Sequence, residues 1–99
     1  MIQRQFVRIG NRHVHYRYAG SGPVLILLHQ SPQNSRMWLS MIERFAGQYT
    51  VIAPDTPGFG HSDPLPADGP RDMAAFGHAT WELVQALGLE RVAVFGLHP

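Results

Sequence analysis

Three short apolar runs that do not alternate with polar residues constrain the fold more than any other feature of this sequence. They lie within VLILLH at 24–29, YTVIAPD at 49–55 and RVAVFG at 91–96. A strand with one face in water alternates apolar and polar side chains, whereas a strand covered on both faces does not. The three runs therefore predict three buried strands of a parallel sheet.

Two segments with helical periodicity separate these strands. The first helix is predicted after Asn34 or Ser35, either of which can cap it, and Gly47 is placed to end it. Its buried stripe consists of Met37, Trp38, Met41, Ile42 and Phe45. The second helix is predicted from 71 to 87, with Gly88 as its C-cap. Its inner stripe consists of Phe76, Thr80, Leu83, Val84 and Leu87.

A β-hairpin is predicted before the first buried strand. The segments 5–9 and 13–19 alternate in polarity, and Gly10-Asn11 between them is a turn signal. Four arginines near the hairpin are interpreted as solvated side chains at strand edges: Arg4, Arg8, Arg12 and Arg17. The order of elements predicts an α/β fold with three layers. Helices cover both faces of a mostly parallel sheet, which begins with an N-terminal antiparallel hairpin.

The composition excludes several classes of protein. The chain has 99 residues, enough for one small domain, and a formal net charge of +1 without a basic patch, which argues against nucleic acid as a partner. It has no cysteine, and its longest apolar run, VLILL, is too short to cross a membrane. The first ten residues lack the apolar core of a signal peptide, so we expect a cytoplasmic location.

Ligands of such sheets bind beyond the carboxyl ends of the strands, where this chain has loops at 29–35, 55–64 and 96–99. The motifs around these loops are LLHQSPQNSRMW, VIAPDTPGFGHSDP and VAVFGLHP. Together and in this order they resemble the α/β-hydrolase superfamily, in particular its epoxide hydrolase and haloalkane dehalogenase branch. The resemblance implies that residues 1–99 are the N-terminal part of a single α/β-hydrolase domain, ending at the nucleophile elbow.

The resemblance also implies an activity. Members of this family hydrolyse small organic substrates, so the expected substrate is an ester, an epoxide, a haloalkane or a compound with a C–C bond beside a carbonyl. The family usually works without a cofactor, and none is expected. His13 and His15 share one strand face and are a candidate metal pair, but no third ligand follows at a suitable spacing, so no metal site is expected.

The first loop is similar to the family's oxyanion loop. In the family a His-Gly pair follows the strand, and the backbone N–H of the next residue helps to stabilise a developing oxyanion. Here the pair is His29-Gln30, which makes the Ser31 N–H the candidate donor and His29 a structural residue that shapes the loop. Gln30 stands where the family has glycine. Its side chain narrows the pocket and disfavours a positive φ, so the loop is expected to depart from the family's usual geometry.

The second loop, DTPGFGHSDP, is not a nucleotide-binding motif. A dinucleotide fingerprint needs a third glycine where Asp63 stands, and a phosphate-binding P-loop needs a Gly-Lys-Ser/Thr ending. The resemblance implies a structural turn beside the active site instead, braced by Asp55. Phe59 and His61 are the expected pocket-lining residues of this loop, whereas Ser62 and Asp63 are expected to bond local backbone.

The third loop fits the first four positions of the family's nucleophile elbow, Gly-x-nucleophile-x-Gly. The nucleophile position holds His98, and the following Pro99 has no N–H to serve as the second oxyanion donor. The family's acid and base lie downstream of these positions, so the 99-residue chain is expected to be inactive by itself. Three explanations of His98 stay open: a natural departure from the family, an inactivated site, or a chain end that is not native.

Three functional hypotheses follow. In the first, the protein is a hydrolase that binds a small-molecule substrate. In the second, it is a non-catalytic α/β-hydrolase-fold protein that binds a ligand or a partner. In the third, it is a truncated product without function, whose last strand is an uncovered apolar edge through which copies of the chain could associate.

Overall fold

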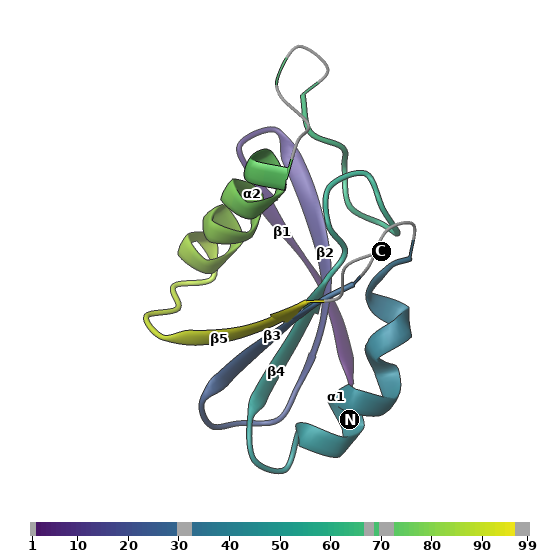
Figure 1. The fold of residues 1–99 in the computed structure, drawn as a ribbon, viewed down its shortest axis with the longest axis vertical. Helices are drawn as coiled ribbons and strands as arrows, with labels where there is room; N and C mark the ends of the chain where they lie inside the picture. The colour runs from purple at the N-terminus through teal and green to yellow at the C-terminus, as the bar shows by residue number, and fades with distance from the viewer. Residues whose placement is uncertain (1, 30–32, 67–68, 70–72, 97–99) are drawn as a thin grey trace.

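The computed structural model describes residues 2–29, 33–66, 69 and 73–96 (Figure 1). Its first two strands are β1 (Gln3–Ile9) and β2 (Arg12–Ala19), which pair in antiparallel fashion. Gly10 lies in the turn between them with a φ of 61°, a left-handed conformation that glycine adopts without steric cost. The predicted hairpin is therefore confirmed.

Three parallel strands complete a five-stranded mixed sheet. They are β3 (Val24–Leu28), β4 (Thr50–Pro54) and β5 (Val92–Gly96). The strand order is β1-β2-β4-β3-β5, in which β3 is parallel to both of its neighbours and β2 joins β4 in antiparallel fashion. This arrangement confirms the predicted α/β fold with an N-terminal antiparallel hairpin.

The predicted first helix begins as a 3₁₀ turn, η1 (Ser35–Trp38), and continues as α1 (Leu39–Phe45). Asn34 caps it as predicted, because its side-chain oxygen accepts from the Arg36 N–H at 2.8 Å. The helix ends where Gly47 was placed to end it: Phe45 is its last residue, and the C-cap Ala46, whose N–H donates to the Ile42 carbonyl, comes directly before Gly47, which has no positive φ.

The second helix, α2 (Met73–Ala86), connects β4 to β5. Its end confirms the predicted glycine cap, since Gly88 has a φ of 69° and the Leu89 N–H reaches back to the Val84 carbonyl at 3.1 Å. Within the ranges that the structure describes, no helix combines the length and the apolar character that crossing a membrane requires.

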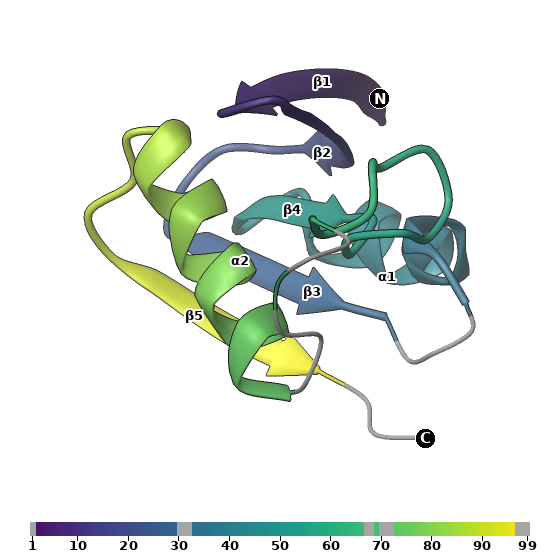
Figure 2. The same ribbon diagram turned by 90° about the horizontal axis from the view of Figure 1, so that it is seen from above.

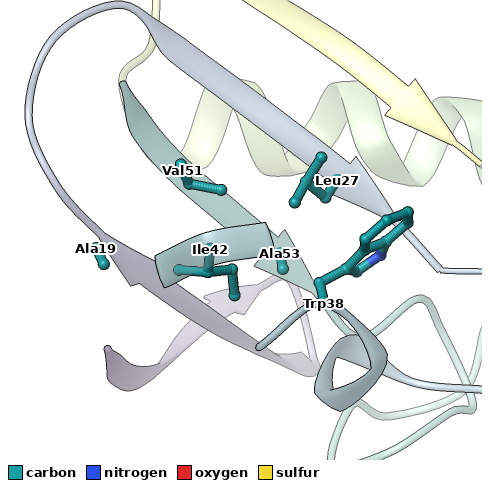
Figure 3. Packing of buried hydrophobic residues seen from close by; sticks show 6 residues of the cluster. All are labelled: Ala19, Leu27, Trp38, Ile42, Val51 and Ala53. Atoms are coloured by element: carbon teal, nitrogen blue, oxygen red, sulfur yellow. The ribbon is translucent and has the colours of Figure 1, made fainter. Parts of the chain in front are cut away.

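The two helices cover opposite faces of the sheet (Figure 2). On the α1 face, the main core joins Trp38 and Ile42 to side chains of three strands, as Figure 3 shows; the cluster is Ala19, Leu27, Trp38, Ile42, Val51 and Ala53. Ile26 and Ile52 alternate with these strand residues and are buried on the other face, where α2 contributes Leu83. Both faces of β3 and β4 are thus covered, which explains their unbroken apolar runs.

The last strand differs from its prediction. VAVFG reads as a buried strand, yet β5 lies at the edge of the sheet, with Val94 52% and Phe95 48% exposed. The reason is its position: β5 pairs only with β3, and no other described strand covers its outer edge. An apolar run reports that a strand is suited to burial, but the strand order decides whether it is buried.

Candidate functional site

The candidate site lies at the carboxyl ends of β3 and β4. The chain leaves β3 toward α1 on one face of the sheet and leaves β4 toward α2 on the other. Such a divergence between adjacent parallel strands is the place where ligands bind in open α/β sheets. The described residues on either side of this point are His29, which follows β3, and Asp55 and Thr56, which follow β4.

A hydrogen bond from Thr56 to His29 links the two loops. The Thr56 N–H donates to His29 Nε2 at 2.9 Å, and the Thr56 hydroxyl lies 3.0 Å from the same nitrogen. Nε2 is therefore an acceptor, which places the proton of the neutral ring on Nδ1. The ring is buried, and Phe59 packs edge-on against it at 5.6 Å between ring centroids. His29 accordingly holds the loops together, and its Nε2 lone pair is occupied.

The Asp55 carboxylate connects three segments of the chain. Oδ1 accepts from the Ser35 N–H at 2.6 Å, and Oδ2 accepts from the His61 N–H at 3.0 Å. His15 Nδ1, on β2, lies 2.7 Å from the same Oδ2. Burial by itself raises the pKa of the Asp55 carboxyl, but the hydrogen bonds from His61, Ser35 and His15 outweigh it and lower the pKa below its ordinary value. The carboxylate is therefore ionised at neutral pH.

Gly60 allows the loop to approach this carboxylate closely. Its φ of 53° is left-handed, and a Cβ built on it would overlap the Asp55 carboxyl group. The second glycine of the Gly-Phe-Gly sequence therefore serves the Asp55 network.

His15 is a fully buried partner of Asp55 that the sequence did not identify. Its Nδ1–H donates to Asp55, and its Nε2 accepts from Arg4 Nε at 3.0 Å, so both nitrogens are engaged. Burial lowers the pKa of His15 below its ordinary value against the raising effect of Asp55, and the charges of Arg4 and Arg17 lower it further. The ring is therefore neutral, with its proton on Nδ1.

The candidate metal pair does not form in this structure. His15 is turned into the Asp55 network, whereas the His13 ring lies 3.5 Å from the Asp63 carboxylate. Among the residues with described positions, no group of three or more histidine, aspartate or glutamate side chains is arranged to hold a metal ion.

The Ser62 side chain bonds its own turn, as predicted, and also the distant His15 N–H, whereas the Asp63 side chain bonds the distant His13 N–H, which corrects the prediction of local bonding for Asp63. The Ser62 hydroxyl donates to the Asp55 carbonyl at 2.6 Å and accepts from the His15 N–H at 2.9 Å. Asp63 Oδ2 accepts from the His13 N–H at 2.8 Å. These contacts arise because β2 pairs with β4, which brings residues 47 and 50 positions apart together at the end of the sheet.

The interpretation of the hairpin arginines as solvated holds for Arg4 and Arg8, which are exposed, and was wrong for Arg12 and Arg17, which are partly buried. Arg4 binds His15, and Arg17 Nε donates to the Ser35 hydroxyl at 3.1 Å. Arg12 forms an ion pair with Glu82 of α2 at 3.2 Å, and its side chain is only 12% exposed. Arg8 Nε donates to the Gly10 carbonyl in the hairpin turn at 3.1 Å. No spacing along the chain could reveal these partners, because the sheet brings them together.

The remaining residues predicted for the site lie partly outside the described ranges. Gln30, Ser31 and His98 lie outside the described residues, as does Pro99. Phe59 is half-buried and His61 is exposed, beside the Asp55 network. A small hollow beneath α2 involves neither of them; it is lined by residues that include Arg12, Val14, Pro54, Thr56 and Leu83. The pocket-lining role of Phe59 and His61 stays a prediction.

Comparison with known proteins supports the family resemblance. A family model described as alpha/beta hydrolase fold matches residues 23–97. The soluble epoxide hydrolase of Corynebacterium sp. (strain C12) is 43% identical over 89 residues, which cover 89% of this chain and 30% of that protein. The fluoroacetate dehalogenase of Burkholderia sp. is 34% identical over 98 residues, covering 96% of this chain and 32% of that protein.

Solved structures share the same architecture. The epoxide hydrolase CorEH, solved without ligand, superimposes with a TM-score of 0.87 and 39% sequence identity, over 95% of this chain and 32% of that chain. The chain spans between 23% and 32% of the length of the curated relatives it matches. The matched region contains β3, β4, β5 and both loops of the candidate site.

Proposed function

The chain belongs to the α/β-hydrolase fold family, and from this premise we propose that it is the N-terminal part of a hydrolase of small organic substrates. Relatives with the names epoxide hydrolase and fluoroacetate dehalogenase favour an epoxide or an alkyl halide as the substrate class. Esters and compounds with a C–C bond beside a carbonyl remain further candidates within the same family.

The observation that carries this proposal is that hydrogen bonds link the two loops at the carboxyl ends of β3 and β4. His29 ties them through Thr56, and Asp55 ties the Ser35 and His61 amides. An oxyanion donor contributes to catalysis only when it is held in place before the charge develops. We assign that donor to the Ser31 N–H in the loop between His29 and Ser35, with Phe59 and His61 at the pocket wall.

The 99-residue chain by itself is expected to be inactive. The described His15–Asp55 pair is buried beyond the reach of substrate, with side-chain exposures of 0% and 1%, and the His29 Nε2 is engaged by Thr56. His98 occupies the nucleophile position, and Pro99 after it has no N–H to donate.

A direct assay tests this expectation. The purified chain is incubated with an aryl epoxide, with fluoroacetate and with a p-nitrophenyl ester, and the expected rate equals that of buffer. Saturable turnover that disappears in His98→Ala would contradict the expectation and would show that His98 takes part in the reaction.

The hydrolase proposal itself is tested on the gene. We would read the DNA that follows the codon for Pro99, and express any product that continues in frame. Turnover of one of these substrate classes by that product supports a hydrolase. Saturable binding of the same compounds without turnover supports the non-catalytic ligand-binding protein, the alternative that His98 and Pro99 favour.

A product without function is the remaining alternative, and the exposed β5 favours it. Size-exclusion chromatography and hydrogen exchange on the 99-residue chain distinguish it. Aggregates with weak protection support it, whereas a monodisperse monomer with a protected sheet counts against it.

A further inference from the structure

A buried histidine on β2 contacts the carboxylate that links the candidate loops, although β2 carries none of the family motifs. His15 is 0% exposed, and its Nδ1 lies 2.7 Å from Asp55 Oδ2. Asp55 in turn holds the Ser35 amide at the end of one loop and the His61 amide in the other. His15 is thus connected to both loops of the site through the Asp55 carboxylate.

We propose that His15 is a positioning residue, whose Nδ1–H orients the Asp55 carboxylate and thereby sets the placement of the loops after β3 and β4. It cannot be a catalytic residue, because neither its ring nor the Asp55 carboxyl group is open to substrate. The catalytic consequence of this role rests on the proposed hydrolase function, whereas its structural consequence does not.

The surroundings of His15 explain why the ring holds one orientation. Arg4, from β1, donates to Nε2 at 3.0 Å, so this nitrogen must stay unprotonated and Nδ1 must carry the hydrogen that faces Asp55. The rings of Phe6 and His61 pack on it, each at 5.1 Å between centroids. Arg4 therefore selects the tautomer, and the two rings restrict rotation.

The geometry of Asp55 explains why its orientation matters. Its two oxygens accept from amides that lie 26 positions apart in the sequence, Ser35 and His61, at 2.6 and 3.0 Å. A rotation of the carboxyl group away from His15 would move both acceptor oxygens. Ser35 follows the loop to which the proposed oxyanion donor Ser31 belongs, so the same rotation would release the anchor at Ser35.

Three substitutions of His15 separate its two nitrogens. In His15→Phe the aromatic volume remains but both nitrogens are lost. In His15→Asn the side-chain amide nitrogen falls near the position of Nδ1, so the donor to Asp55 is retained. In His15→Gln the amide group falls near the position of Nε2, where it meets Arg4 and leaves Asp55 without its partner.

The measurement is amide hydrogen exchange of the ¹⁵N-labelled 99-residue chain at neutral pH. We expect His15→Phe and His15→Gln to lower the protection of the Ser35 and His61 amides about tenfold or more, the effect of losing a hydrogen bond to a charged group. Amides shared between β3 and β4 serve as an internal reference for global stability. His15→Asn is expected to restore the two loop amides.

Unchanged protection of Ser35 and His61 in both His15→Phe and His15→Gln overturns the proposal. Equal behaviour of His15→Asn and His15→Gln also overturns it, and this comparison remains readable if His15→Phe does not fold. In a longer, active product the same series should lower kcat more than it changes KM, with recovery in His15→Asn. If that product has no activity, the hydrolase proposal fails while the exchange result still decides the role of His15.

Discussion

At the scale of single residues, the buried charge of Asp55 organises the candidate site. A buried carboxylate is costly unless it is hydrogen-bonded, and both oxygens of Asp55 accept hydrogen bonds, from Ser35, His61 and His15. The three partners come from different parts of the chain. The loop after β4 therefore owes its shape to tertiary contacts as much as to its glycines and prolines.

We predict that Asp55→Asn destabilises the chain by about 3 kcal/mol or more, because an amide nitrogen then faces donors in a buried site. The control is Asp63→Asn, at a carboxylate that is 48% exposed. Its remaining oxygen can still accept from the His13 N–H, so its effect should stay within about 0.5 kcal/mol. Urea unfolding measures both changes, and equal losses would show that Asp55 has no special role.

Two glycines give a second matched comparison. Gly60→Ala combines a left-handed φ with overlap on Asp55 and should cost about 2 kcal/mol. Gly77→Ala, in α2 with no atom within 4 Å of the added Cβ, should stabilise the chain by about 0.5–1 kcal/mol. Thermal unfolding should therefore shift in opposite directions, and a stabilising Gly60→Ala would refute the close approach.

At the scale of elements, β1 joins the sheet through its ladder with β2 and, in addition, through a hydrogen bond from Arg4 to His15 that we expect to depend on pH. Arg4 donates to the neutral Nε2 of His15, and a proton on that nitrogen would set a donor and a positive charge against the Arg4 guanidinium. The other charged or titratable groups around the ring are Arg17 on β2 and, after β4, Asp55 and His61. The hydrogen bond between His15 Nδ1 and Asp55 would remain when Nε2 is protonated. The repulsion would therefore act on Arg4 and, through it, on β1.

The direction of the pH effect follows from the lowered pKa values. Because the pKa of His15 is below 6.5 in the folded chain, the unfolded chain binds more protons, and the stability present above pH 6.5 is lost as the pH falls through the folded value. Asp55, whose pKa is lowered from 3.8, adds a further loss at more acidic pH. We expect urea unfolding to show falling stability below pH 6.5 and His15→Asn to reduce that slope. An unchanged slope in His15→Asn would contradict this account.

At the scale of the whole molecule, the two edges of the sheet differ in protection. The outer strand β1 carries Arg4 and Arg8 among its seven residues, whereas β5 has no charged residue. Charged side chains on edge strands disfavour pairing with other chains, so β5 is the edge more prone to pair with a second chain. We infer that copies of the 99-residue chain associate through β5.

This inference predicts that Val94→Lys reduces self-association, since it places a charge on the exposed apolar edge. Gln5→Lys, on the exposed β1, adds the same charge at the opposite edge and should have no such effect. Analytical ultracentrifugation over a range of concentrations compares the two. An equal reduction would assign the effect to net charge, and no reduction would exclude β5 as the interface.

The sequence by itself determined the elements, their order and the family. Unbroken apolar runs identify strands that are suited to burial, helical spacing identifies the helix faces, and Gly10 and Gly88 mark turns whose positive φ few other residues tolerate. These signals are local, so they can be read along the chain. The positions of the loops at the strand ends follow from the same order of elements.

Only the tertiary structure decided which residues meet at those loops and which strand is exposed. The Arg4–His15–Asp55 chain joins β1, β2 and the loop after β4, and its bonds span 11 and 40 positions in the sequence. The exposure of β5 depends on the strand order, which cannot be read from the five residues of β5 themselves. A buried polar group forms hydrogen bonds with the groups that the fold brings within about 3 Å of it. Which groups these are depends on how the strands pair, and no single segment of the sequence contains that information.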